Sequence, residues 1–179
     1  HWTADPDSES VCATACERGR MYARSTTVHA DPNAIDAGIA FLRDNYPALR
    51  GAVQFFLDTL VPDPTHGWLV TNPSSSPELT HHAGAAVCAG PTMDMQILRD
   101  LFNACDRAGA VPRVDDDFRQ QVRTTRDRLA PMQVGARGNL QEWVEDWVET
   151  AREHRHISHL YGLHPSNQIT KRGTPELFE

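Results

Sequence analysis

The chain has 179 residues with a net charge of −7, and 40% of its residues are hydrophobic. This size and composition are those of a soluble globular protein with one domain-sized core. The acidic balance argues against a nucleic-acid partner, because such binding depends on Lys and Arg side chains that neutralise phosphates. No run reaches the roughly 18 apolar residues that a membrane span needs, which argues against a membrane partner.

Residues 1–33 are polar and carry no sustained hydrophobic period, so we expect a divergent or irregular N-terminal segment. The chain starts at His1, and we expect the true N-terminus to be missing or processed, so this end does not reveal the compartment. The cysteines are too scattered for a disulfide scaffold and form no zinc motif. We expect free thiols or buried apolar residues at Cys12, Cys16, Cys88 and Cys105.

From residue 34 onward the pattern becomes helical. Ile35, Ile39 and Leu42 recur at helical spacing, and this helix is expected to stop ahead of Pro47. Pro47 then suits the first turn of a second helix with an apolar stripe. That stripe consists of Leu49, Val53, Phe56, Leu57 and Leu60. Together the two segments predict a helical hairpin.

A long connection follows at residues 68–78, which read Trp-Leu-Val-Thr-Asn-Pro-Ser-Ser-Ser-Pro-Glu. Long connections in compact domains are usually functional or disordered. Pro73 and Pro77 restrict the backbone on both sides of the serines, and Asn72 and Glu78 are groups able to bind or transfer a proton. The alternative is that the serines form a solvated turn and that Glu78 is an ordinary surface acid.

A second helical hairpin is predicted between residues 91 and 130. Pro91 and Asp94 mark the start of its first helix, which ends at Ala108 and Gly109. Its second helix begins near Asp115, in a plausible N-cap region. The buried positions are predicted to be Ile97, Leu98, Leu101, Phe102 and Cys105 on the first helix, and Phe118, Val122 and Leu129 on the second.

Residues 131–139 read as a loop, and residues 140–149 predict a short helix with Trp143 and Trp147 on its apolar side. A short apolar turn follows at residues 157–162, and no segment predicts a sheet. Near the end, Thr174 is a candidate N-cap and Pro175 a first helical residue. They predict the start of a helix that the chain does not complete.

Three histidines lie within six residues, at His154, His156 and His159. Clustered imidazoles can indicate a metal site, and a helical metal-binding protein is one alternative function. Their spacings do not place all three on one helical face, however, so we expect no metal here.

Four segments in this order resemble the catalytic barrel of the family 95 glycoside hydrolases, the α-L-fucosidases and α-L-galactosidases. They are residues 68–78, Gly90-Pro-Thr-Met-Asp-Met-Gln, Leu140-Gln-Glu-Trp, and the His-rich residues 154–168. The resemblance covers residues 41–179 and fades before about residue 40. It implies a neutral fucosylated oligosaccharide or glycan as partner, hydrolysis with inversion, and no cofactor.

The resemblance also implies the site residues. Glu78 matches the general acid in the family's Pro-Ser-x-Ser-Pro-Glu pattern, and Trp68 or Trp143 could supply an apolar wall beside it. The residues expected to bind the sugar are Asn72, Asp94, Glu142, Trp143, His154 and His156. Structural alternatives stay open: a turn residue at Asn72, a helix cap at Asp94, and a core position at Trp143.

The family activates water with asparagines that an aspartate polarises, and we find no match for these residues in this chain. About six or seven helices are predicted, whereas a closed ring of twelve needs roughly 250 residues or more. We therefore predict an all-α chain whose helical hairpins form about half of an (α/α)6 toroid. Residues 34–179 would be the partial barrel domain, without the β-rich flanking domains of the full-length family members.

The sequence thus predicts a fragment of an inverting exo-glycosidase that hydrolyses terminal α-L-fucosyl or α-L-galactosyl residues. This fragment would carry the general acid and part of the sugar pocket, and whether the isolated chain is active stays open. The alternative is a non-catalytic helical protein, either a sugar-binding module or a degenerate remnant that lacks the base machinery.

Overall fold

The computed structural model describes residues 32–148 and 153–179. The predicted irregular segment, residues 1–33, lies outside the described residues except for its last two positions, and Cys12 and Cys16 lie outside them as well. The described elements are the α-helices α2 (Pro32–Thr59), α3 (Thr92–Ala110), α4 (Asp116–Arg126) and α5 (Pro175–Phe178), and the 3-10 helices η2 (His82–Gly84) and η3 (Ser158–Gly162). The predicted helical fold class is confirmed, whereas the half toroid and the domain division stay predictions.

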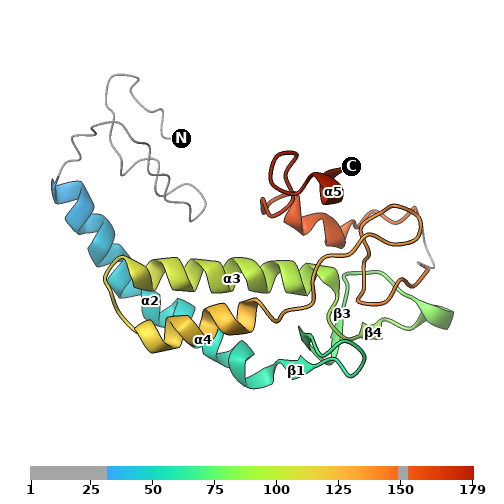
Figure 1. The fold of residues 1–179 in the computed structure, drawn as a ribbon, viewed down its shortest axis with the longest axis horizontal. Helices are drawn as coiled ribbons and strands as arrows, with labels where there is room; N and C mark the ends of the chain where they lie inside the picture. The colour runs from blue at the N-terminus through green and yellow to red at the C-terminus, as the bar shows by residue number, and fades with distance from the viewer. Residues whose placement is uncertain (1–31, 149–152) are drawn as a thin grey trace.

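Helix α3 is the centre of the fold. It packs against α2, α4 and η3, and Figure 1 shows α2 crossing it while α4 runs alongside. The predicted hairpin of α3 and α4 is confirmed, and Phe102, Cys105 and Val122 are fully buried between the helices. None of the described helices combines the length and apolarity that a membrane crossing requires.

The first predicted hairpin is wrong, because α2 is one continuous helix that contains Pro47. Proline removes one backbone hydrogen bond from a helix interior, which opposes continuation. The apolar stripe nevertheless runs across the proline without a break in phase, and Leu42, Tyr46, Leu49 and Val53 all join the core beneath α3. Burial of that stripe outweighs the lost hydrogen bond.

The prediction that no segment forms a sheet is also wrong. The antiparallel pairs are β1 (Val61–Pro62) with β2 (Leu69–Val70), and β3 (Ser74–Ser75) with β4 (Val87–Cys88). Each strand has two residues, which is too short to show the alternation that reveals a strand in a sequence. The pair of β3 and β4 matters for the site, because β3 lies within residues 68–78.

The predicted helix at residues 140–149 does not form over the described residues 140–148, which are irregular. Backbone carbonyls that a helix would engage internally are taken by other segments. Thr92 donates to the carbonyl oxygens of Gln141 and Glu142, and the Gln133 amide donates to that of Val144. These long-range bonds replace the helical ones and fasten the segment to the start of α3.

Asp115 and Thr174 occupy the predicted N-cap positions of α4 and α5, but neither side chain makes a cap hydrogen bond. Asp115 precedes α4 with a left-handed backbone (φ 53°), and its carboxylate pairs with Arg50 at 2.9 Å instead of capping the helix. Thr174 precedes α5, but its hydroxyl accepts a hydrogen bond from the Thr170 backbone N–H. Pro175 does occupy the first position of α5, as predicted.

Candidate active site

The loop at residues 71–78, called the acid loop below, is held at three points. Its first part is fastened to α3 by Asp94, which lies in the first turn of that helix. The hydroxyls of Thr71 and Ser74 both donate to Asp94 Oδ2, each at 2.6 Å. A carboxylate that accepts two short hydrogen bonds fixes both donors, and the second oxygen, Oδ1, carries neither bond.

The middle of the acid loop is held by a buried carboxylate. Ser76 donates a hydrogen bond to Glu142 Oε1, and His159 Nδ1 donates one to Glu142 Oε2. Glu142 is 3% exposed and Ser76 is 2% exposed. This three-residue link joins the acid loop, the irregular 140–148 segment and the His-rich segment.

The end of the acid loop meets the His-rich segment at the surface. Glu78 Oε2 lies 2.6 Å from Arg155 Nη2 and 3.1 Å from His156 Nε2, and the Glu78 side chain is 57% exposed. Ser158 Oγ also donates to the carbonyl oxygen of Pro77 at 2.5 Å. The structure therefore brings Glu78 together with the imidazole segment that the sequence placed far away.

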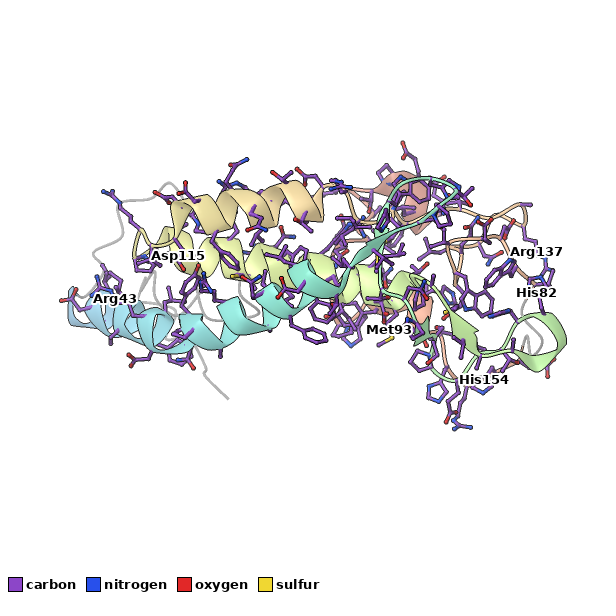
Figure 2. All side chains as sticks on the ribbon, turned by 90° about the horizontal axis from the view of Figure 1, so that it is seen from below. Arg43, His82, Met93, Asp115, Arg137 and His154 are labelled. Atoms are coloured by element: carbon purple, nitrogen blue, oxygen red, sulfur yellow. The ribbon has the colours of Figure 1, made fainter. Side chains whose placement is uncertain are left out.

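His154 and His156 lie side by side near Glu78. Their ring centroids are 5.2 Å apart, and the His156 backbone N–H donates to His154 Nδ1 at 3.2 Å. Figure 2 shows His154 projecting from the edge of the molecule, away from the helices. His159 instead bonds to the buried Glu142 carboxylate. In the described part of the chain, no three metal-binding side chains gather to hold an ion.

Trp143 lies beneath the acid loop instead of facing solvent. Its side chain is 1% exposed and packs with Leu79 and Cys88 in a small apolar cluster, with its ring edge-on to His81 at 5.5 Å. Among the described residues, its indole Nε1 has no hydrogen-bond partner. Trp143 therefore packs under the residue that follows Glu78.

Asn72 and Trp68 occupy outer positions. Asn72, the second residue of the acid loop, is exposed. Trp68 is partly buried and stacks on His66, with ring centroids 4.2 Å apart and nearly parallel planes. That stack belongs to the hairpin of β1 and β2, whereas Trp143 lies directly under the acid loop.

The thiol of Cys88 lies in the same apolar cluster, on the strand paired with Ser74. Burial raises the pKa of Cys88 to about 11, against a lowering by a backbone hydrogen bond from Ser76, and the negative charges of Asp94 and Glu142 raise it further. A thiol with this pKa stays protonated at neutral pH.

The hydroxyls that hold the acid loop are not among the residues predicted from the sequence. Thr71, Ser74 and Ser76 donate to carboxylates, while Ser75 is exposed. The signal available in the sequence was the period of two along Ser74, Ser75 and Ser76, because extended residues two apart share a face. The partners of these hydroxyls lie 20 or more positions away, so no local pattern could reveal them.

Comparisons with known proteins identify the family of this chain. The glycosyl hydrolase family 95 catalytic domain matches residues 36–179. Alpha-L-fucosidase 2 of Arabidopsis thaliana is 36% identical over 140 residues, which cover 75% of this chain and 16% of the relative. Probable alpha-fucosidase A of Aspergillus niger is 35% identical over 131 residues, covering 70% of this chain and 16% of that relative.

A further relative, probable alpha-fucosidase A of Aspergillus oryzae, is 30% identical over 105 residues, covering 55% of this chain and 14% of that relative. The chain thus spans about one sixth of the length of these relatives. The family match extends over most of the chain and includes every residue of the acid loop and its partners. This chain belongs to the glycosyl hydrolase family 95 catalytic domain family.

Proposed function

We propose that this chain supplies the general acid and part of the sugar pocket of a glycosidase that hydrolyses terminal α-L-fucosyl residues with inversion. The substrate class is supported by the names of the relatives, which are α-fucosidases. In an inverting reaction, a carboxylic acid protonates the departing oxygen while a base activates water on the opposite face of the sugar. No cofactor takes part in this chemistry.

The observation that carries the proposal is the position of Glu78. It stands at the end of a loop held by Asp94 and Glu142, beside the imidazole of His156. A general acid must reach the departing oxygen at hydrogen-bonding distance, so its backbone must be fixed while its carboxyl stays accessible. Glu78 meets both requirements, because its loop is fastened and its side chain is 57% exposed.

The ion pair of Glu78 with Arg155 must be reconciled with this role, since a general acid has to carry a proton. The pair is largely exposed, with 73% of the Arg155 side chain open to solvent. Exposed pairs of this kind contribute only about 0–1 kcal/mol. A bound glycoside can therefore displace Arg155 at small cost, and the protonated carboxyl then faces the departing oxygen.

The remaining site residues are proposed as a sugar pocket around Glu78. His154 and His156 present polar ring atoms beside the acid, Asn72 presents an amide, and Asp94 retains one carboxylate oxygen for a sugar hydroxyl. Trp143 supports the pocket from below by packing against Leu79. Glu142 instead accepts hydrogen bonds from Ser76 and His159.

Replacing Glu78 tests the proposal in the protein expressed from its complete reading frame. With an alkyl α-L-fucoside, which has a poor leaving group, Glu78→Gln should lower kcat by about 10²- to 10⁴-fold, the usual contribution of a general acid. The exposed Glu176 of α5 is the matched control, and Glu176→Gln should leave kcat unchanged. Equal turnover by Glu78→Gln and the parent protein would overturn the assignment.

Two further readouts complete the test. The anomer released first, followed by NMR, should be β-L-fucose, because inversion of an α-linkage gives the β-anomer. Calorimetry with L-fucose separates the alternative of a non-catalytic sugar-binding protein, which would bind the sugar while the parent protein hydrolyses no fucoside.

A further inference from the structure

We propose that Glu142 is a positioning residue, which holds the general acid in place through Ser76 and His159 and does not itself bind the sugar. This inference rests on the proposed role of Glu78 as the acid. It assigns to Glu142 a task that differs from the one its resemblance to family residues implies.

The contacts of the carboxylate carry the argument. Oε1 accepts from Ser76, two residues before Glu78, and Oε2 accepts from His159, three residues after His156. Glu78 and His156 therefore each lie within three sequence positions of a residue that donates a hydrogen bond to the buried Glu142 carboxylate. A sugar hydroxyl that donated to Glu142 would have to displace one of these bonds inside the protein, since Glu142 is 3% exposed.

His159 is in turn fixed from α3. The amide of Gln96, which is fully buried, donates from Nε2 to the His159 carbonyl oxygen at 2.8 Å. Its Oε1 accepts from the Gly162 backbone N–H at 3.0 Å. A Cβ at position 162 would lie 2.7 Å from Gln96 Nε2, so a larger residue there would force the Gln96 amide to move.

Glu142 is fastened to α3 as well. Its backbone carbonyl accepts from the Thr92 N–H at 3.0 Å, at the first residue of the helix. Glu142 and His159, which share a hydrogen bond, are therefore both anchored to α3. Supporting contacts on a rigid element hold an active group more accurately than contacts between loops.

The other connections between the acid loop and the His-rich segment are weaker. The Glu78 pair with Arg155 is exposed and screened by water and salt. The bond from Ser158 to the Pro77 carbonyl is a single neutral hydrogen bond at the surface. The bonds to Glu142 are charge-assisted and buried, so they are the strongest of the set.

Two fucosides distinguish positioning from other roles. An alkyl fucoside needs protonation of its departing oxygen, whereas a 2,4-dinitrophenyl fucoside departs without it. A variant with a misplaced acid should lose kcat on the alkyl substrate only. A partly unfolded variant should lose activity on both, and loss of a sugar ligand should raise KM on both.

The variants are Ser76→Ala, Glu142→Ala and Glu142→Gln, in the protein expressed from its complete reading frame. Ser76→Ala and Glu142→Ala should lower kcat on the alkyl fucoside by about 10- to 100-fold, because small misplacements of a catalytic group have effects of this size. Turnover of the dinitrophenyl fucoside and the Kd for L-fucose should not change. Ser75→Ala, on an exposed neighbour, is the control and should match the parent protein.

Glu142→Gln should retain most activity. Its amide oxygen still accepts from Ser76, and its NH₂ donates to His159 Nδ1 once the imidazole proton moves to Nε2. If Glu142→Ala fails to fold, as Tm and circular dichroism would show, Ser76→Ala decides the question, because it removes only one hydroxyl.

A raised Kd for L-fucose in Glu142→Gln, or equal losses on both fucosides in Ser76→Ala, would overturn the inference. Glu78→Gln is the comparison variant that separates failure of this inference from failure of the proposed function. If it is as active as the parent protein on the alkyl substrate, the proposed function itself fails. If it is impaired there while Ser76→Ala is not, only the role of Glu142 fails.

Discussion

The two ends of this chain are stabilised in different ways. At the helical end, α2, α3 and α4 enclose a continuous apolar core that includes Val53, Phe102 and Val122. At the loop end, the apolar cluster is small, with Leu79, Cys88 and Trp143 at its centre, and carboxylates accept the hydrogen bonds that hold the loops. Figure 2 shows the separation, with Arg43 and Asp115 at one end and His82 and His154 at the other.

This difference allows one chain to combine a stable core with the exposed carboxyl of Glu78, the proposed general acid. A packed apolar core tolerates no open space, so a carboxyl that must meet a substrate cannot lie inside it. Hydrogen bonds to buried carboxylates fix a loop by its backbone and hydroxyls while the tip stays open. Helix α3 joins the ends, since it supplies Phe102 to the core and Asp94 and Gln96 to the loops.

The largest effect on stability should come from the helical core. Phe102 is fully buried, and Phe102→Ala should lower the free energy of unfolding by about 3–5 kcal/mol through lost burial and a cavity. Phe55, on α2, is 60% exposed, so Phe55→Ala is the control and should stay within about 0.5 kcal/mol. Urea unfolding measures both values. Equal effects would mean that the apolar core does not lie where the structure places it.

The second largest effect on stability should come from the junction between the helical end and the loop end. Arg99, on α3, donates from Nη2 to the carbonyl oxygens of Leu129 and Ala130, at 3.0 and 2.8 Å, where the chain leaves α4 for the loops. Arg99→Met should lower the free energy of unfolding by about 1–3 kcal/mol, because it leaves both carbonyls without this donor. The exposed Arg43 offers the comparison, and Arg43→Met should change stability little. Matching losses in the two variants would contradict the account.

A smaller effect tests the hydrogen bonds that hold the acid loop. Ser74→Ala removes a donor to Asp94 and should lower the free energy of unfolding by about 1 kcal/mol. Ser75→Ala, at the exposed neighbouring position, should stay within about 0.5 kcal/mol. Thermal unfolding followed by circular dichroism compares the two variants. A larger loss of stability in Ser75→Ala than in Ser74→Ala would contradict the role of the Ser74 hydrogen bond.

The smallest effect near neutral pH concerns Cys88. Because its pKa rises from 9.0 to about 11 on burial, its contribution to stability is complete below pH 9 and is lost as the pH rises through 11. At pH 9 the folded thiol should resist iodoacetamide, whereas urea-unfolded protein should react readily. Peptide mass spectrometry follows alkylation at Cys88 itself. Equal labelling rates in the two states would show that the thiol is not buried.

The two ends also differ in how far the sequence predicts them. The hairpin of α3 and α4 follows from helical spacing, and its predicted buried residues Phe102, Cys105 and Val122 are buried, whereas Ile97, also predicted to be buried, is 38% exposed. The break at Pro47 was wrong because a local rule for proline was overridden by the apolar stripe packed beneath α3. Tertiary burial decides such cases, and the local sequence does not record its size.

At the loop end the sequence predicts which segments matter but not how they meet. Family resemblance singles out Glu78, Glu142 and the His-rich segment. In the link from Ser76 through Glu142 to His159, the two hydrogen bonds join positions 66 and 17 residues apart, so the link has no local signature. The irregular backbone around Glu142 has the same cause, since the carbonyl oxygens of Gln141 and Glu142 bond to Thr92 instead of forming a helix.

In the proposed function, the fastened acid loop presents the Glu78 carboxyl to a departing glycosidic oxygen. The most direct test is a crystal structure of the protein from its complete reading frame, as Glu78→Gln, with an uncleaved α-L-fucoside bound. We expect the side-chain amide at position 78 to lie about 2.6–3.2 Å from the glycosidic oxygen, with Arg155 displaced from it. A fucoside bound away from position 78, or one whose glycosidic oxygen faces another carboxyl, would contradict it.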